Sequence, residues 1–519
     1  MKTIQQQVGG RPLSAVTPEK TMDPPSSQAT VDDEGAQQLR EAGGAAMPPD
    51  LTMKCIVEAW NVLPAETRSE LKRLLIESET SSGVPGGDTA GGSLVEDGES
   101  FQPLNGYDYA KPEPLARAPK NVFVFRGKQQ QVLGWRNVFD LPIQYDVELC
   151  PGLLSPEAAK LTILVAVVAV VAVVAAIRAS TDEAVSEVYG AKMSANFANH
   201  GVEVRYVVLP GEEANKRMEA VDTILEELCR FGLRRREPIL AVGGGVLLDI
   251  VGMAASLYRR GVPFVRVPTT LLALVDASVG VKNGVDYCSC SMGPQKNRVG
   301  TFYAPVGAFL DKSFIATQDE RNIINGLGEI MKLALVRSTE LFSLLELHGA
   351  RLVRERFQGA DGVSDRVIEL SVQIMLEELG PNLWEHKLER CVDYGHTFSK
   401  IIEMEPAADI MHGEAVNVDG FLCLVIAKRR GMITEAVLDR VFRVMKSIGL
   451  PTIHESVQLA PMVKGLADAV EHRHGKQRVP LLKGGIGSSV CVNDINPDEL
   501  KGAIAEAWAL HGDNKDAKP

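Results

Sequence analysis

Between residues 121 and 313 the chain alternates short apolar runs with stretches of helical periodicity, and this pattern restricts the possible folds more than any other feature. The apolar runs lie at 122–125, 145–149, 202–209, 238–242 and 264–267, and the clearest helical stretches at 215–231 and 247–259. Strands that alternate with helices form βαβ units with a parallel sheet. The sequence therefore predicts an α/β domain over residues 119–313.

Beyond residue 314 the strand pattern disappears. Long amphipathic stretches follow at 321–335, 366–379, 413–430 and 435–448, apart from one possible hairpin near 479–492. They predict a mostly helical domain over residues 314–510 and a short tail at 511–519. A cleft between two such domains is the usual place for a ligand.

Residues 1–118 differ in composition from the rest of the chain. They are rich in Gly, Pro, Ser, Thr and acidic residues, which cannot bury enough apolar surface to order a chain. We expect a largely disordered extension, with one possible amphipathic helix at 51–78.

Residues 161–177 form an apolar run whose only polar member is Thr162. A membrane helix needs about 20 apolar residues, and a Val/Ala-rich run suits a buried parallel strand at least as well. We favour the strand and keep the membrane span as the alternative.

The net charge of −12 argues against nucleic acid or an anionic membrane as a partner. No apolar leader begins the chain and its eight cysteines include no CxxC pair, so we expect a cytoplasmic protein with reduced thiols.

A strand, three glycines and a helix start follow one another in ILAVGGGVLLD, where the glycines are Gly243, Gly244 and Gly245. Bare glycines let a diphosphate approach the backbone, and the helix N-terminus offers N–H donors. A purely structural turn is the alternative. The next predicted strand is followed by hydroxyls, an acid and a lysine, in VPTTLLALVDASVGVK, where α/β proteins place ligands.

Several long motifs occur in the order typical of the dehydroquinate-synthase superfamily. They are GGGVLLD, YRRG, VPTTLLALVDASVGVK, KNRVGTFYAP, GEIMK, YGHTFS and MHGEAV, and the resemblance covers roughly residues 180–500. It implies a Rossmann-like NAD-binding domain followed by a helical metal-binding domain. It also implies that NAD is held by Asp182, Glu213, Lys216, Gly244, Gly245, Asp249, Thr269 and Thr270.

The resemblance also implies three metal ligands, Glu329, His396 and His412. One carboxylate and two imidazoles are typical of a catalytic Zn²⁺ site with open positions, and Co²⁺ is possible. The spacing of the three residues is too wide to reveal the site by itself.

The implied reaction is the closure of a sugar phosphate into a carbocycle. NAD transiently oxidises a ring hydroxyl, phosphate leaves by β-elimination, the same NADH reduces the ketone, and an intramolecular aldol step closes the ring. The resemblance places Asp276 and Lys332 at the reacting sugar, and we expect Asp393 to orient one of its hydroxyls. It places Lys282 and Asn297 near the phosphate, together with Arg260, which would reach the partner subunit of a homodimer, and Lys296 is a further candidate. Lys400 stands in the phosphate pocket where this group commonly has a proline.

Two substitutions argue against dehydroquinate synthase itself. Met375 and Glu389 stand where that enzyme holds its substrate carboxylate with a lysine and an arginine. The sister group acting on sedoheptulose 7-phosphate fits better. Within it, Leu379, Asp393 and His472 favour formation of 2-epi-5-epi-valiolone.

Four alternatives stay open. Desmethyl-4-deoxygadusol synthase and 3-dehydroquinate synthase share the chemistry. A metal-dependent alcohol dehydrogenase of similar fold would release NADH. A non-catalytic scaffold would use residues 1–118 to bind a partner.

Residues 1–118 carry no motif of the superfamily, so a truncated protein that begins at Lys120 should keep full catalytic activity. Steady-state kinetics of the truncated and full-length proteins, with circular dichroism as a folding control, test this expectation. Loss of activity in a folded truncated protein would show that the segment contributes to the site.

Overall fold

The computed structural model describes residues 113–114, 122–126, 132–137, 142–155, 158, 169–176, 185–289, 293–405 and 409–512. The chain divides into two compact units, residues 1–136 and 137–519. The first holds a sheet of three strands, β1 (Glu113–Pro114), β2 (Val122–Arg126) and β3 (Val132–Asn137), of which only the last residue of β3 falls in the second unit. The amphipathic helix expected at 51–78 lies outside the described residues.

A six-stranded parallel sheet forms the first half of the second unit, in the order β4-β11-β8-β7-β5-β6. Its strands are β4 (Asp146–Leu149), β5 (Ala169–Ala176), β6 (Glu203–Pro210), β7 (Ile239–Gly243), β8 (Phe264–Pro268) and β11 (Gly307–Leu310). The fully apolar strands β7 and β11 are buried along their whole length, as the central strands of a parallel sheet require. The predicted α/β half is confirmed.

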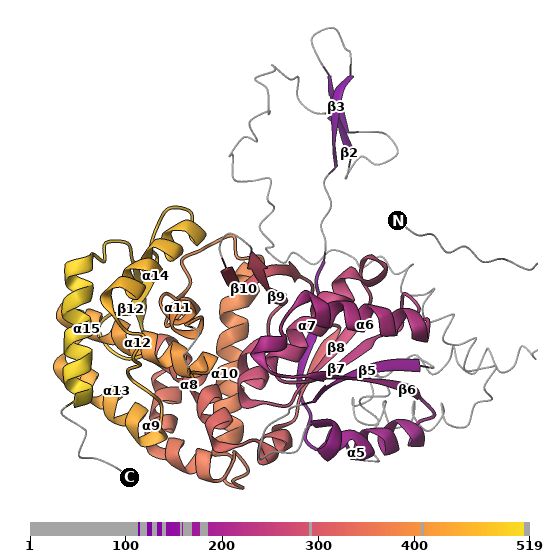
Figure 1. The fold of residues 1–519 in the computed structure, drawn as a ribbon, viewed down its shortest axis with the longest axis horizontal. Coiled ribbons are helices and arrows are strands. Elements are labelled where there is room, and N and C mark those ends of the chain that lie inside the picture. The colour runs from indigo at the N-terminus through magenta and orange to yellow at the C-terminus, as the bar shows by residue number, and fades with distance from the viewer. Residues whose placement is uncertain are drawn as a thin grey trace, which may run out of the picture. The chain divides into compact units, whose positions relative to one another are not determined.

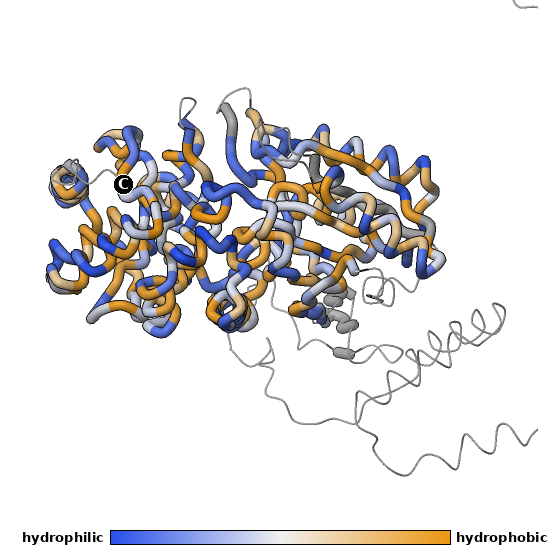
Figure 2. The backbone as a smooth tube through the Cα atoms, turned by 90° about the horizontal axis from the view of Figure 1, so that it is seen from below, coloured by the Kyte–Doolittle hydropathy of each residue, from blue (hydrophilic) through white to orange (hydrophobic). Residues whose placement is uncertain are grey.

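Helices cover both faces of this sheet. Figure 1 shows α5 (Val185–Asn199) on one face and α6 (Met218–Phe231) with α7 (Gly245–Leu257) on the other. Figure 2 shows hydrophobic segments, drawn in orange, alternating with hydrophilic ones along the backbone. Side chains from the sheet and from all three helices form one continuous core.

The apolar run at 161–177 contains β5. This strand pairs in parallel with β6 on one side and with β7 on the other, so the strand interpretation holds for Ala169–Ala176. Its Val/Ala composition fits a central strand with neighbours on both sides. The rest of the run lies outside the described residues, among which no helix is long and apolar enough to cross a membrane. No disulfide joins the described cysteines to one another.

A long antiparallel hairpin, β9 (Lys282–Ser289) and β10 (Gly293–Phe302), was not predicted from the sequence. Its strands are rich in Gly, Lys and Asn and lack a regular apolar alternation. Arg266, on β8 and fully buried, anchors the start of β9. Its guanidinium donates to the carbonyl of Lys282 at 3.1 Å and to Oδ1 of Asn283 at 2.7 Å.

The second half of this unit is helical, as predicted. It contains α8 (Glu320–Arg337), α9 (Thr339–Arg354), α10 (Val363–Leu379), α11 (Ser399–Glu403), α12 (His412–Arg429), α13 (Glu435–Ile448), α14 (Leu459–His472) and α15 (Pro497–Gly512). The predicted hairpin is present as β12 (Val479–Leu482) and β13 (Ser489–Val492). Since the sheet and these helices lie in one compact unit, the division at residue 314 stays a prediction.

Candidate active site

The glycine turn lies at the point where the order of the sheet strands reverses. β5 leads to β6 on one side, and the chain then crosses back to β7 on the other side of β5. The crevice at the carboxyl ends of β5 and β7 is therefore the expected ligand position in such a sheet. Gly243 ends β7, and Gly244 precedes the first turn of α7.

The backbone of this turn is closely packed. The N–H of Thr269 donates to the carbonyl of Gly243 at 3.0 Å, and a Cβ on Gly244 would lie 3.2 Å from the side chain of Thr270. A Cβ on Gly245 would meet Ala277 at 3.2 Å. The close packing thus favours glycine at both positions, and the turn lies at the N-terminus of α7, where backbone N–H groups suit a diphosphate.

Three of the residues that the resemblance assigns to NAD lie close together. Lys216 contacts Asp249, and its backbone N–H donates to the carbonyl of Glu213. Nζ of the buried Lys216 lies 2.7 Å from Oδ2 of Asp249 and donates to Oδ1 of Asn297 at 2.7 Å. Glu213 begins the short 3-10 helix η1 (Glu213–Asn215) and contacts Lys296 at 3.1 Å. Asp182 lies outside the described residues.

Glu329, His396 and His412 come together although they lie far apart in the sequence. One ligand atom of each lies within 4.8 Å of the others. Glu329 is on α8, His396 follows the short 3-10 helix η6 (Cys391–Asp393), and His412 is the first residue of α12. The structure therefore brings together the three residues that the sequence could not connect by spacing.

Both imidazoles are oriented by a hydrogen bond through Nδ1. His396 donates from Nδ1 to the carbonyl of Tyr394 at 3.1 Å, and His412 donates from Nδ1 to Oε1 of Glu403 at 2.8 Å. Each Nε2 is left facing Oε1 of Glu329, at 3.7 Å and 3.2 Å respectively. Such hydrogen bonds fix the tautomer and ring orientation of metal-binding histidines.

The charges of the cluster favour a cation. Burial opposes ionisation of Glu329, but Lys332 and the two histidines hold the pKa of its carboxyl well below the usual range. Burial, with Lys332 nearby, lowers the pKa of His396 to about 3, which keeps this ligand neutral. For His412 burial is outweighed by Glu403 and Glu329, which raise its pKa to about 9.

Glu329 provides the test of whether a metal fits. Its side chain is only 1% exposed, and neither carboxylate oxygen has a hydrogen bond of good geometry among the described residues. The ammonium of Lys332 contacts Oε2, and Oε1 faces the two imidazoles. Buried carboxylate oxygens without hydrogen bonds are costly unless a cation compensates them. With two Nε2 atoms facing the same oxygen, the donor set suits a divalent metal such as Zn²⁺.

The loop that carries His396 is held by one buried carboxylate. Oδ2 of Asp419, on α12, accepts from the backbone N–H groups of three consecutive residues, Thr397 at 2.7 Å, Phe398 at 2.5 Å and Ser399 at 2.9 Å. Its side chain is fully buried. The position of one imidazole therefore depends on the helix that supplies the other.

The helices of the other two ligands cross at glycines. A Cβ on Gly328 of α8 would lie 2.2 Å from the carbonyl oxygen of Gly413, and a Cβ on Gly413 would lie 1.9 Å from the carbonyl oxygen of Asn325. Only glycine fits at either position. This close approach sets the separation between Glu329 and His412.

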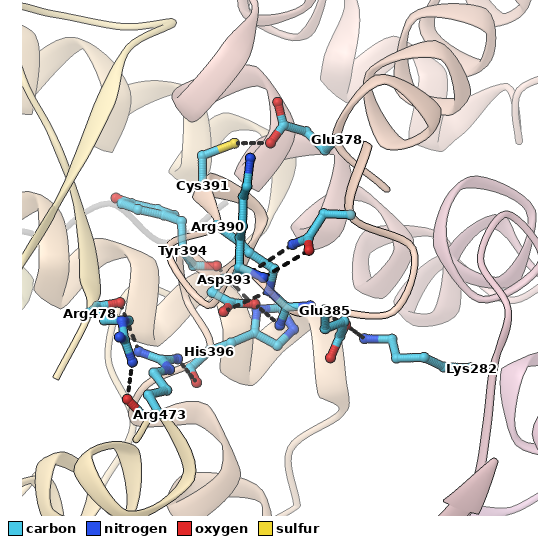
Figure 3. Close-up of polar contacts among 12 residues, drawn as sticks. Lys282, Glu378, Glu385, Arg390, Cys391, Asp393, Tyr394, His396, Arg473 and Arg478 are labelled. Carbon is cyan, nitrogen blue, oxygen red and sulfur yellow. Dashed lines mark hydrogen bonds and ion pairs between the residues drawn. The ribbon is translucent and has the colours of Figure 1, made fainter. Parts of the chain in front are cut away.

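Around the residues that the resemblance assigns to the sugar and its phosphate, acidic and basic side chains form close pairs (Figure 3). Arg390 donates to Asp393 at 2.6 Å and also contacts Glu385, and Glu385 lies 3.0 Å from Nζ of Lys282. Nζ of Lys332 lies 3.8 Å from Oδ2 of Asp276 and also contacts Glu329. The structure thus places Lys332 and Asp276 beside the metal ligands, and Asp393 in the neighbouring polar cluster.

A group of cations lies next to this cluster. Burial lowers the pKa of the Lys400 ammonium, and the positive charge of the nearby Arg473 guanidinium lowers it further. Partial removal from solvent and the positive charge of Lys400 both lower the pKa of the His472 imidazole. Leu379 ends α10, and a Cβ on Gly280, two residues before Lys282, would meet its side chain at 3.3 Å.

Two predicted substrate contacts are placed less directly. Arg260 is exposed at the end of the 3-10 helix η2 (Tyr258–Arg260), with a φ of 67°. Lys296 lies on β10 with its ammonium already between Glu213 and Glu403. Their roles at a phosphate stay predictions.

Sequence reasoning missed three residues of the site, Glu403, Arg390 and Asp419. Glu403 pairs with the distant Lys296 and Asp419 accepts from backbone N–H groups, so no local pattern marks these two. Arg390 pairs with the nearby acids Glu385 and Asp393, a pattern that exposed loops also show.

Both halves of the chain are similar to known proteins. The 3-dehydroquinate synthase N-terminal family model matches residues 206–325, and the C-terminal family model matches residues 326–469. A 2-epi-5-epi-valiolone synthase from Streptomyces albus is 46% identical over 72% of this chain and 90% of its own length.

The chain belongs to the 3-dehydroquinate synthase family. A demethyl-4-deoxygadusol synthase from Trichormus variabilis is 36% identical, over 63% of this chain and 80% of its own. Among solved structures, the 2-epi-5-epi-valiolone synthase from Streptomyces hygroscopicus with NAD⁺ and Zn²⁺ bound has a TM-score of 0.67 and 43% identity. That match covers 72% of this chain and 100% of the other. The predicted superfamily and fold class are confirmed.

The glycine crossing leads to a prediction. Gly328→Ala should push α8 and α12 apart, destabilise the fold by about 1–3 kcal/mol and reduce bound zinc. Thermal melting and metal analysis measure both effects. Gly190→Ala is the matched control, since Gly190 lies in α5 with nothing near its added methyl. It should leave zinc unchanged, and full zinc with an unchanged melting temperature in Gly328→Ala would contradict the prediction.

Proposed function

We propose that the protein is a sugar-phosphate cyclase that converts sedoheptulose 7-phosphate into 2-epi-5-epi-valiolone with loss of phosphate. Its similarity to 2-epi-5-epi-valiolone synthases, at 46% identity over 90% of one relative, supports this activity. NAD would be held by the glycine turn with Thr269 and Thr270, and a divalent metal, Zn²⁺ or Co²⁺, by Glu329, His396 and His412. When bound, NAD supplies a reversible hydride acceptor and the metal a Lewis acid.

One observation carries the choice of substrate. Met375, at one position expected to hold a substrate carboxylate, is buried in the helical core, and Glu389, at the other, is exposed and lies 3.8 Å from Arg478. Arg390 is the guanidinium next to Glu389, but its charge is already balanced by Asp393 and Glu385. An acidic substrate would therefore bury a carboxylate without a cationic partner, at a cost of several kcal/mol.

The remaining residues fit a neutral sugar phosphate. Lys332 can donate to a sugar oxygen beside the metal ligands, and Asp276 faces the same position. Asp393 can accept from a sugar hydroxyl in a charge-assisted hydrogen bond. Lys400 and Lys282 offer positive charge for the phosphate.

We also propose that the enzyme works in the cytoplasm as a homodimer. The exposed position of Arg260 at the end of η2 is compatible with a contact to the partner subunit's substrate.

Purified protein with sedoheptulose 7-phosphate should release phosphate and form 2-epi-5-epi-valiolone, identified by mass and NMR. Because the reduction step reverses the oxidation, absorbance of NADH at 340 nm should not accumulate in proportion to product. Stoichiometric NADH would favour a simple dehydrogenase. Efficient turnover of the carboxylate-bearing substrate of 3-dehydroquinate synthase would restore that alternative.

The choice of product should depend on Leu379, Asp393 and His472. Changing them together to Glu, Ala and Thr should shift or abolish formation of 2-epi-5-epi-valiolone, by at least about tenfold in kcat/KM, because the sugar loses its orienting contacts. NAD⁺ affinity, measured by calorimetry, should stay within a factor of about two, since none of the three is among the residues assigned to NAD. An unchanged product profile would remove these residues from the specificity assignment.

A further inference from the structure

Glu403 contacts groups on both sides of the active site. It ends α11, and its side chain is 6% exposed. Oε1 accepts from Nδ1 of His412 at 2.8 Å, while Oε2 contacts the ammonium of Lys296. One buried carboxylate therefore joins a helix of the metal site to the β9–β10 hairpin.

Lys296 extends this connection toward the residues assigned to NAD. Its ammonium also lies 3.1 Å from Oε1 of Glu213, and its side chain is 10% exposed. The next residue, Asn297, accepts from Lys216, which pairs with Asp249. Its backbone N–H donates to Asp286 at 2.7 Å, which fixes this part of the hairpin.

We propose that Glu403 is a positioning residue that fixes the metal ligand His412 and the hairpin residue Lys296 together, and so ties the metal site to the nucleotide site. This inference rests on the metal and NAD sites of the proposed function. Glu403 touches neither cofactor position directly. It acts by holding Nδ1 of His412 as a donor, which leaves Nε2 as the ligand atom.

The carboxylate is needed because both of its partners are donors. One oxygen accepts from an imidazole N–H and the other from an ammonium, and a carboxylate can only accept. A glutamine in the same place would turn an N–H₂ group toward one of these donors. Either His412 would change its tautomer, or Lys296 would move toward Glu213.

The test uses Glu403→Gln in the full-length protein, with affinities for Zn²⁺ and NAD⁺ measured by competitive chelation and calorimetry. Zinc affinity should fall by about 10–100-fold, as expected when the partner of a metal-binding histidine is removed. NAD⁺ affinity should fall as well, by severalfold. The absorption spectrum of the Co²⁺-loaded variant should change in position or intensity, which a simple loss of stability would not produce.

Two further variants make the outcome decisive. Glu405→Gln is the matched control, because Glu405 is an exposed glutamate two residues later, and it should leave all three measurements unchanged. His412→Ala should lose zinc outright. Full zinc in His412→Ala would remove the metal site itself, and with it the proposed function. If His412→Ala loses zinc but a folded Glu403→Gln protein keeps wild-type zinc affinity and a wild-type cobalt spectrum, only the role of Glu403 is overturned.

Discussion

The three hydrogen bonds from backbone N–H groups to Asp419 are the interaction on which the metal-binding half depends. They fix the loop after His396 against α12, the helix that begins with His412. From residue 413 to 427 every position of this helix is buried, so it cannot shift without disturbing the core around it. α8 packs against the same helix through glycines. One buried helix thus sets the positions of all three ligands.

Much of the fold could be predicted from the sequence, because burial leaves a periodic pattern. β7 is a continuous apolar run, and amphipathic helices such as α13 repeat their apolar residues at helical spacing. The β9–β10 hairpin could not be predicted in this way. Its strands are polar, and its position depends on Arg266, whose guanidinium reaches the backbone of β9 from β8 of the six-stranded sheet.

The site was predictable only where residue type and family resemblance coincide. Glu329, His396 and His412 were nominated by resemblance, and the structure places their ligand atoms together. Glu403 and Asp419 carry no local signal, because an acidic residue within a helix usually faces solvent. Lys296 shows the opposite case. Its sequence position suggests a phosphate contact, but the folded chain surrounds its ammonium with two carboxylates.

The glycine contact between α8 and α12 makes the distance between two ligands a property of the main chain. Side chains can change rotamer, but two helices in backbone contact cannot approach further, and they separate only by opening the core around them. Zn²⁺ forms bonds of about 2.0–2.2 Å to nitrogen and oxygen, whereas Ca²⁺ needs about 2.3–2.6 Å and more ligands. The separation of Glu329 and His412, on which the fit of a small cation depends, is therefore set by residues that have no side chain.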